Sequence, residues 1–167
     1  IGALGGFLFH EAIPALCAIA LDATENEEIR AQALNPGLRY MRHPDAVKTA
    51  IALATDKSLR IRGNAYCVLS EHKSNDAFEV LVARLRAKDT PLIDQLIMAV
   101  ISMSSKHPRA GKIVFQCVDF STLPHDERYL LAYSRAMAIC RIPEAQQNML
   151  FLAQQADRPL SCYYALR

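Results

Sequence analysis

The residues that could do chemistry in this sequence are histidines, carboxylates and cysteines, and they are widely scattered. A metal centre needs several His and carboxylate ligands that converge, yet the motif HEA at His10–Ala12 is the only His-Glu pair. Four similar stretches later in the chain, RHPDA, SNDA, KHPRA and IPEA, contain no second pair. There is also no G-x-S-x-G motif and no C-x-x-C pair. We therefore predict no catalytic residues, no bound metal and no cofactor.

Basic residues gather at three places along the chain and define the first candidate site. If these places stack, they form one basic edge that could bind nucleic acid or another polyanion. The overall charge disfavours a dedicated nucleic-acid-binding protein, because 19 Lys and Arg face 17 Asp and Glu, for a net charge of +2. The alternative interpretation is that these cations complement the negative C-terminal ends of helices. The basic residues are Arg39, Arg42, His43, His72, Lys73, Lys106, His107, Arg109 and Lys112.

A recurring alanine reveals the elements that must position these residues. It lies at Ala12, Ala46, Ala77, Ala110 and Ala145, at intervals of 34, 31, 33 and 35 residues. Proline precedes three of these alanines by two positions, as expected for a first helical turn, whose N–H groups need no partner within the helix. Apolar residues then follow with helical spacing. Helices are therefore expected to start near Pro44, Asn75, Pro108 and Pro143.

A second marker falls half a period later and indicates another helix in each unit. It is a side chain suited to cap a helix N-terminus, and it recurs as Asn26, Asp56, Asp89, Asp126 and Asp157. Each unit is thus expected to contain two helices, A and B, which bury a continuous core when stacked. The prediction is an all-α chain, a single domain over residues 1–167, built as an α-solenoid of about five two-helix repeats.

The repeat resembles HEAT repeats, especially the short bacterial kind found in phycobilin lyases. The B helices of that family typically carry Val-Arg and then Ala, and ENEEIRAQAL, with Arg30, and DKSLRIRGNA, with Arg62, fit this pattern. The third unit departs from it, with Asp94 in place of Arg, and Asn35-Pro36-Gly37 should kink the first full B helix. The resemblance implies a right-handed superhelix and a scaffold that binds another protein. A lyase-like enzyme is a third possibility, again by resemblance alone.

The B helices of HEAT-like arrays usually line the concave surface, which makes that surface the main candidate for protein binding. With Ile61 and Ile93 in the core, polar and large side chains of the B helices turn toward this surface. Mixed charge, Tyr and Met suit a protein partner. The alternative is an Arg–Asp ladder that links neighbouring repeats. The candidate residues are Arg30, Arg62, Tyr66, Asp94, Met98 and Arg135.

Other features of the chain bear on its compartment and its ends. Five widely spaced cysteines in apolar surroundings favour free thiols in a reducing, cytoplasmic setting. The longest charge-free runs are about half the roughly 20 residues that a membrane span requires. Both ends carry apolar residues without a neighbouring repeat, so we expect self-association through the ends or a longer native array. These residues are Leu4, Phe7, Leu8, Leu160, Tyr163 and Tyr164.

Overall fold

A computed structural model describes residues 10–88, 90–118 and 127–140. These residues fall into two compact units, Ile1–Leu81 and Val82–Arg167, which are described separately. The described residues contain helices and turns but no strand, so the predicted all-α class is confirmed. The prediction that residues 1–167 form a single domain stays a prediction.

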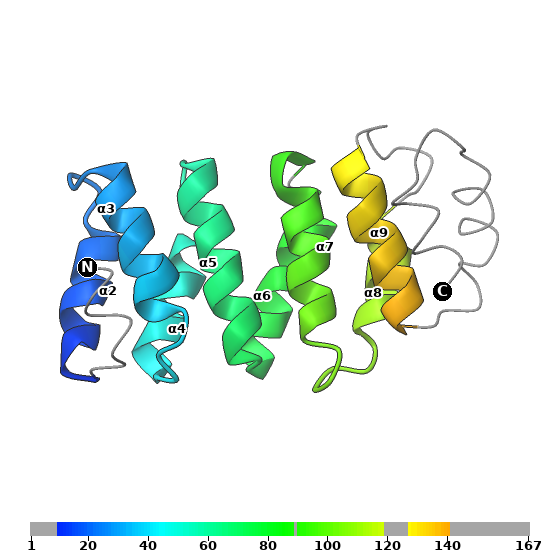
Figure 1. Ribbon diagram of the computed structural model, residues 1–167, viewed down its shortest axis with the longest axis horizontal. Helices are drawn as coiled ribbons and strands as arrows, with labels where there is room; N and C mark the ends of the chain where they lie inside the picture. Colours follow the sequence, from blue (N-terminus) through cyan, green and yellow to red (C-terminus); the bar gives the residue numbers. More distant parts are fainter. Residues whose placement is uncertain (1–9, 89, 119–126, 141–167) are drawn as a thin grey trace. The chain divides into compact units, whose positions relative to one another are not determined.

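The first unit contains successive helices that pack as A–B pairs. Helix α2 lies against α3, α4 and η2, while α5 packs on both α4 and η2 (Figure 1). The boundary between the units falls inside α6, Asn75–Arg86. The elements before α6 are η1 (His10–Ala12), α2 (Ile13–Leu21), α3 (Glu27–Gln32), η2 (Ala33–Leu38), α4 (Pro44–Leu53) and α5 (Leu59–His72).

The second unit has its core between α7, α8 and α9, each of which contacts the other two. Its buried side chains include Leu96, Ile97, Val114 and Tyr133. The elements are η3 (Thr90–Leu92), α7 (Ile93–Ser102), α8 (Ala110–Cys117) and α9 (Glu127–Cys140). Contacting A–B pairs among the described helices are α2 with α3 and α4 with α5 in the first unit, and α8 with α9 in the second; α7 follows α6 along the chain. Pro143, Ala145 and the predicted end surfaces lie outside the described residues.

The recurring alanine has a packing role. Ala46, Ala77 and Ala110 are fully buried, each in the first turn of its helix, and Ala50 and Ala65 are equally buried. A methyl side chain lets helix backbones approach each other closely, because the distance between helix axes depends on the side chains at the contact. The small residue therefore serves close packing at the starts of α4, α6 and α8, whereas Ala12 is half-buried and lies in η1, directly before α2.

The predicted helix starts are confirmed at Pro44 and Asn75, and α8 starts two residues after Pro108. The turn that connects η2 to α4, residues 39–43, is called the joint below. Its last residue caps α4, because the His43 imidazole Nδ1 accepts a hydrogen bond from the Asp45 amide at 3.2 Å. For the B helices, Asn26 caps α3 as predicted, through the Glu28 amide at 2.8 Å.

The predicted cap at Asp56 is wrong. Helix α5 begins at Leu59 and is capped by Ser58, whose hydroxyl accepts from the Ile61 amide at 3.2 Å. Asp56 lies two residues earlier and accepts from the Ser58 amide at 2.8 Å. Its carboxylate instead pairs with Arg30. The equivalent residues Asp89, Asp126 and Asp157 lie outside the described residues.

The predicted kink in the first full B helix is confirmed. Asn35 leaves helical geometry, with φ −138° and ψ 108°, and the Asn35–Pro36 peptide bond is cis. At Gly37 the backbone lies close to its neighbours. A Cβ atom there would lie 3.0 Å from the Gln32 carbonyl oxygen and 3.4 Å from Leu16 Cδ2. The kink directs the chain from α3 through η2 toward the joint that precedes α4.

Candidate functional site

One of the B-helix residues predicted to bind a partner, Arg30, instead belongs to a buried network of hydrogen bonds. Arg30 is 5% exposed; its Nε donates to the Ala20 carbonyl at 3.1 Å and its Nη2 lies 2.7 Å from Asp56 Oδ2. This contact joins two neighbouring repeats, so the Arg–Asp pairing that the sequence leaves as an alternative is present at this position. Arg30 is therefore corrected from a binding residue to a buried link, because its charged group is occupied inside the protein.

The electrostatics of Asp56 agree with this role. Burial opposes the charge on its carboxyl group, but the hydrogen bond from the Ser58 amide and the Arg30 guanidinium outweigh burial and hold the pKa of Asp56 below its ordinary value. Arg62, which is half-buried, donates from Nη1 to the Asp56 carbonyl at 2.8 Å. The network thus fixes the turn between α4 and α5.

Tyr66 is also corrected. It is fully buried, and its hydroxyl donates to the Ala54 carbonyl at 3.3 Å, so its side chain extends from α5 to the end of α4. In the second unit, Asp94 and Met98 on α7 are half-buried and Arg135 on α9 is exposed. Of the predicted set, Arg62, Asp94, Met98 and Arg135 keep accessible surface.

Two large apolar residues that were not assigned to this site are exposed at the first turns of the B helices. Ile29 on α3 is 36% exposed and Leu59 on α5 is 46% exposed. Their neighbours tie the two turns together, because Glu28 forms an ion pair with Arg60 and Glu27 accepts a hydrogen bond from Ser58. The sequence contains a signal for these residues, because an apolar residue follows each cap marker by three positions. The sequence alone does not show whether such a residue is buried in the core or exposed.

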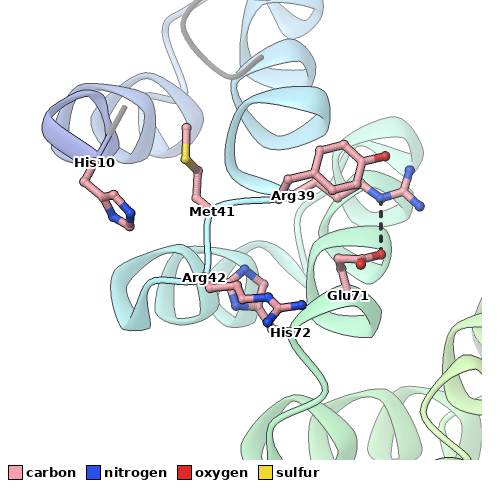
Figure 2. Close-up of a pocket in the computed structure, with 7 residues that line it drawn as sticks. His10, Arg39, Met41, Arg42, Glu71 and His72 are labelled. Atoms are coloured by element: carbon pink, nitrogen blue, oxygen red, sulfur yellow. Dashed lines mark ion pairs between the residues drawn. The ribbon is translucent and has the colours of Figure 1, made fainter. Parts of the chain in front are cut away.

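The predicted basic residues of the first unit converge in part. Arg39, Arg42 and His72 line one pocket of about 430 Å³ where the joint after η2 meets the C-terminal end of α5. His43 serves as the cap of α4, and Lys73 ends α5 with a left-handed backbone at φ 52°. The pocket is lined by His10, Arg39, Tyr40, Met41, Arg42, Glu71 and His72 (Figure 2).

Glu71, Tyr40 and Met41 are the pocket residues that the sequence interpretation missed. Glu71 Oε2 lies 4.0 Å from Arg39 Nε (Figure 2). The Arg39 guanidinium lies over the Tyr40 ring, 5.2 Å from its centroid. The adjacent pair Glu71-His72 at the end of a predicted helix was the available signal for a mixed rather than purely basic cluster.

His72 is a pocket residue whose pKa departs from its ordinary value. Burial lowers its pKa below the ordinary value, while a hydrogen bond to the Leu38 carbonyl and the charge of Glu71 act in the opposite direction. Arg42 adds a further lowering effect. His72 Nε2 is buried and has no hydrogen-bond partner among the described residues.

The basic residues of the second unit are arranged around one turn. Lys106 and Arg109 are exposed in the turn before α8, His107 is half-buried there, and Lys112 is exposed on α8. Helix α8 begins at Ala110, and its N-cap residue Arg109 makes no capping hydrogen bond through its side chain.

The described part of the chain also bears on metal binding, membrane insertion and thiol chemistry. Its His, Cys, Asp and Glu residues form no group of three or more that could hold a metal ion. Among the same residues, every helix is too short or too polar to cross a bilayer. Cys17, Cys67 and Cys117 are free thiols; burial raises the pKa of the first two, which disfavours the reactive thiolate.

Comparison with protein families identifies the class of protein. A model described as HEAT repeats matches residues 13–101, more than half of the chain. The chain therefore belongs to the HEAT-repeat family, in agreement with the paired helices and their buried alanines. No curated protein and no solved structure gives a significant match. HEAT-repeat arrays generally present extended surfaces for binding other proteins.

Proposed function

We propose that this HEAT-repeat chain is a non-enzymatic scaffold that binds another protein through its B-helix surface. In the first unit this surface is defined by Ile29, Leu59, Arg60 and Arg62, on α3 and α5. The observation that carries the proposal is the exposure of Ile29 and Leu59, at 36% and 46%, on two first turns that are tied to each other.

The energetics favour a partner at this surface. Burying the remaining exposed part of each of these two side chains would contribute about 1 kcal/mol. The Glu28–Arg60 ion pair and the Arg30–Asp56 link hold the turns in place, so little ordering would be needed on binding. In the second unit, Asp94, Met98 and Arg135 remain candidates for partner contacts.

Site-specific photo-crosslinking in the native cells tests this function. A photoreactive amino acid at Leu59 should form a discrete adduct with another protein. The matched control is Lys48 on the A helix α4, whose side chain is 77% exposed. Equal adducts at both positions, or none at Leu59, would contradict binding through the B helices.

Binding of nucleic acid or another polyanion through the basic residues is the second candidate. The meeting of Arg39, Arg42 and His72 in one pocket supports it, but Glu71 interrupts the positive charge there. A lyase-like activity, a bacterial origin, a cytoplasmic location and self-association through the ends stay predictions from the sequence.

A further inference from the structure

The pocket at the η2–α4 joint has a surplus of positive charge. Arg39 and Arg42 each contribute a guanidinium group, whereas Glu71 is the only acidic residue in the lining. Glu71 approaches Arg39 at 4.0 Å, which is too long for a hydrogen bond. Arg39 Nε accordingly has no hydrogen-bond partner among the described residues. The fork of donors on Arg39 is therefore not used by Glu71.

The remaining walls suit a ligand with a short apolar stem. Met41 and Tyr40 contribute an apolar side, and the volume of about 430 Å³ lies within the roughly 300–1,000 Å³ typical of ligand pockets. In Figure 2, Arg42 and His72 lie on one side of this space, and His10 comes from the element before α2. The pocket can thus hold one anionic group of a ligand together with the short apolar stem that carries this group.

We propose that this pocket binds a carboxylate side chain in an acidic segment of a partner protein. The proposal rests on the proposed scaffold function and adds the chemistry of one contact. A planar carboxylate matches the donor fork of an arginine in a two-point contact. Its single negative charge also equals the surplus that remains after Glu71 offsets one of the two arginines.

A nucleic acid fits the same pocket less well. Phosphate-backbone binding gains its affinity from many cations that each neutralise one phosphate. Here two arginines share the pocket with the Glu71 carboxylate, which would repel a dense row of phosphates. Nucleic-acid binding is therefore an outcome that the experiment must be able to detect.

The test is an NMR titration of the full chain that follows the side-chain Nε–Hε signals of Arg39 and Arg42. The probes are an end-blocked peptide with four glutamates, the same peptide with four glutamines, and an oligothymidylate of equal charge. We expect saturable shifts with the glutamate peptide and none with the glutamine peptide. The oligothymidylate should bind more weakly than the glutamate peptide.

Single-charge variants provide the controls. Arg42→Gln, at an exposed position, should weaken binding of the glutamate peptide about tenfold, as expected for loss of a charge-assisted hydrogen bond. Lys48→Gln removes the same charge outside the pocket and should change affinity less than twofold. Glu71→Gln should tighten binding severalfold, because it removes the internal competitor. Circular dichroism verifies that each variant remains folded.

Each contrary result overturns the proposal. It fails if no probe gives saturable shifts, if both peptides bind equally, if the oligothymidylate binds more tightly, or if Lys48→Gln acts like Arg42→Gln. The crosslinking at Leu59 is independent of this titration. A partner crosslinked at Leu59 with no peptide bound at the pocket would overturn only the pocket, whereas the reverse outcome would overturn only the B-helix surface.

Discussion

The buried pair of Arg30 and Asp56 gives the most quantitative prediction. Replacing Asp56 with Asn keeps an oxygen that can accept from the Ser58 amide but removes the charge opposite Arg30. The two side chains are 6% and 12% exposed, so the guanidinium would stay buried with its charge uncompensated. Breaking such a pair from one side typically costs about 3–5 kcal/mol. We expect about 3 kcal/mol, since Arg30 retains its hydrogen bond to the Ala20 carbonyl.

Urea unfolding at neutral pH measures this cost for Asp56→Asn, Arg30→Met and the double variant. The double variant should recover much of the loss, because it buries no unpaired charge, and the coupling energy should reach about 2 kcal/mol. Arg60→Gln is the matched control. It breaks the pair with Glu28, whose partners are about half exposed, and should cost less than about 1 kcal/mol.

Two results would refute the reasoning. One is a cost below about 1 kcal/mol for Asp56→Asn, and the other is a double variant whose losses simply add. The pH dependence provides a separate check. The pKa of folded Asp56 lies below 3.8, so the stability that Asp56 contributes is complete above that pH and is lost as pH falls through the folded value. This acid loss should be absent in Asp56→Asn.

Three further predictions concern the backbone, the core and the pocket. Lys73→Gly should raise the free energy of unfolding by about 1 kcal/mol, because φ 52° favours glycine; an unchanged urea midpoint would contradict this. Ala50→Leu keeps a good helix former but overfills a fully buried contact, so thermal unfolding should show a loss of about 1–3 kcal/mol, and a neutral result would mean that α4 has room to move. The lowered pKa of His72 makes the folded state lose stability as pH falls from about 6.5 toward the folded pKa, since the unfolded chain takes up the proton first. His72→Gln should flatten this part of the pH–stability curve, and an unchanged slope would show that another group is responsible.

Local signals predicted the fold well because they act within one helical turn. Pro44 lies at a helix start, Asn26 caps its own helix, and Asn35-Pro36-Gly37 interrupts helical geometry at Asn35. The recurring alanine is fully buried at the starts of α4, α6 and α8. None of these inferences needs knowledge of a distant residue.

The candidate site was harder to predict because distant partners decide which side chains are free. The sequence indicates that Asp56 caps a helix, but in the structure its carboxylate pairs with Arg30 from the preceding repeat. Tyr66 has a polar tip suited to a surface, but the Ala54 carbonyl satisfies that tip inside the core. The pocket combines residues from three separate stretches of the chain, and the charge balance set by Glu71 is visible only when Arg39 is placed beside it.

The fully buried alanines mark positions where substitutions are restricted, in contrast to exposed positions that tolerate them. At Ala46 or Ala110, which are fully buried, a larger side chain would have to fit into the core, and glycine would weaken the helix by roughly 1 kcal/mol. Exposed positions such as Leu59 and Arg60 carry no such restriction. A scaffold of this kind can therefore acquire a different binding specificity by surface substitutions alone, while the spacing between its helices stays fixed.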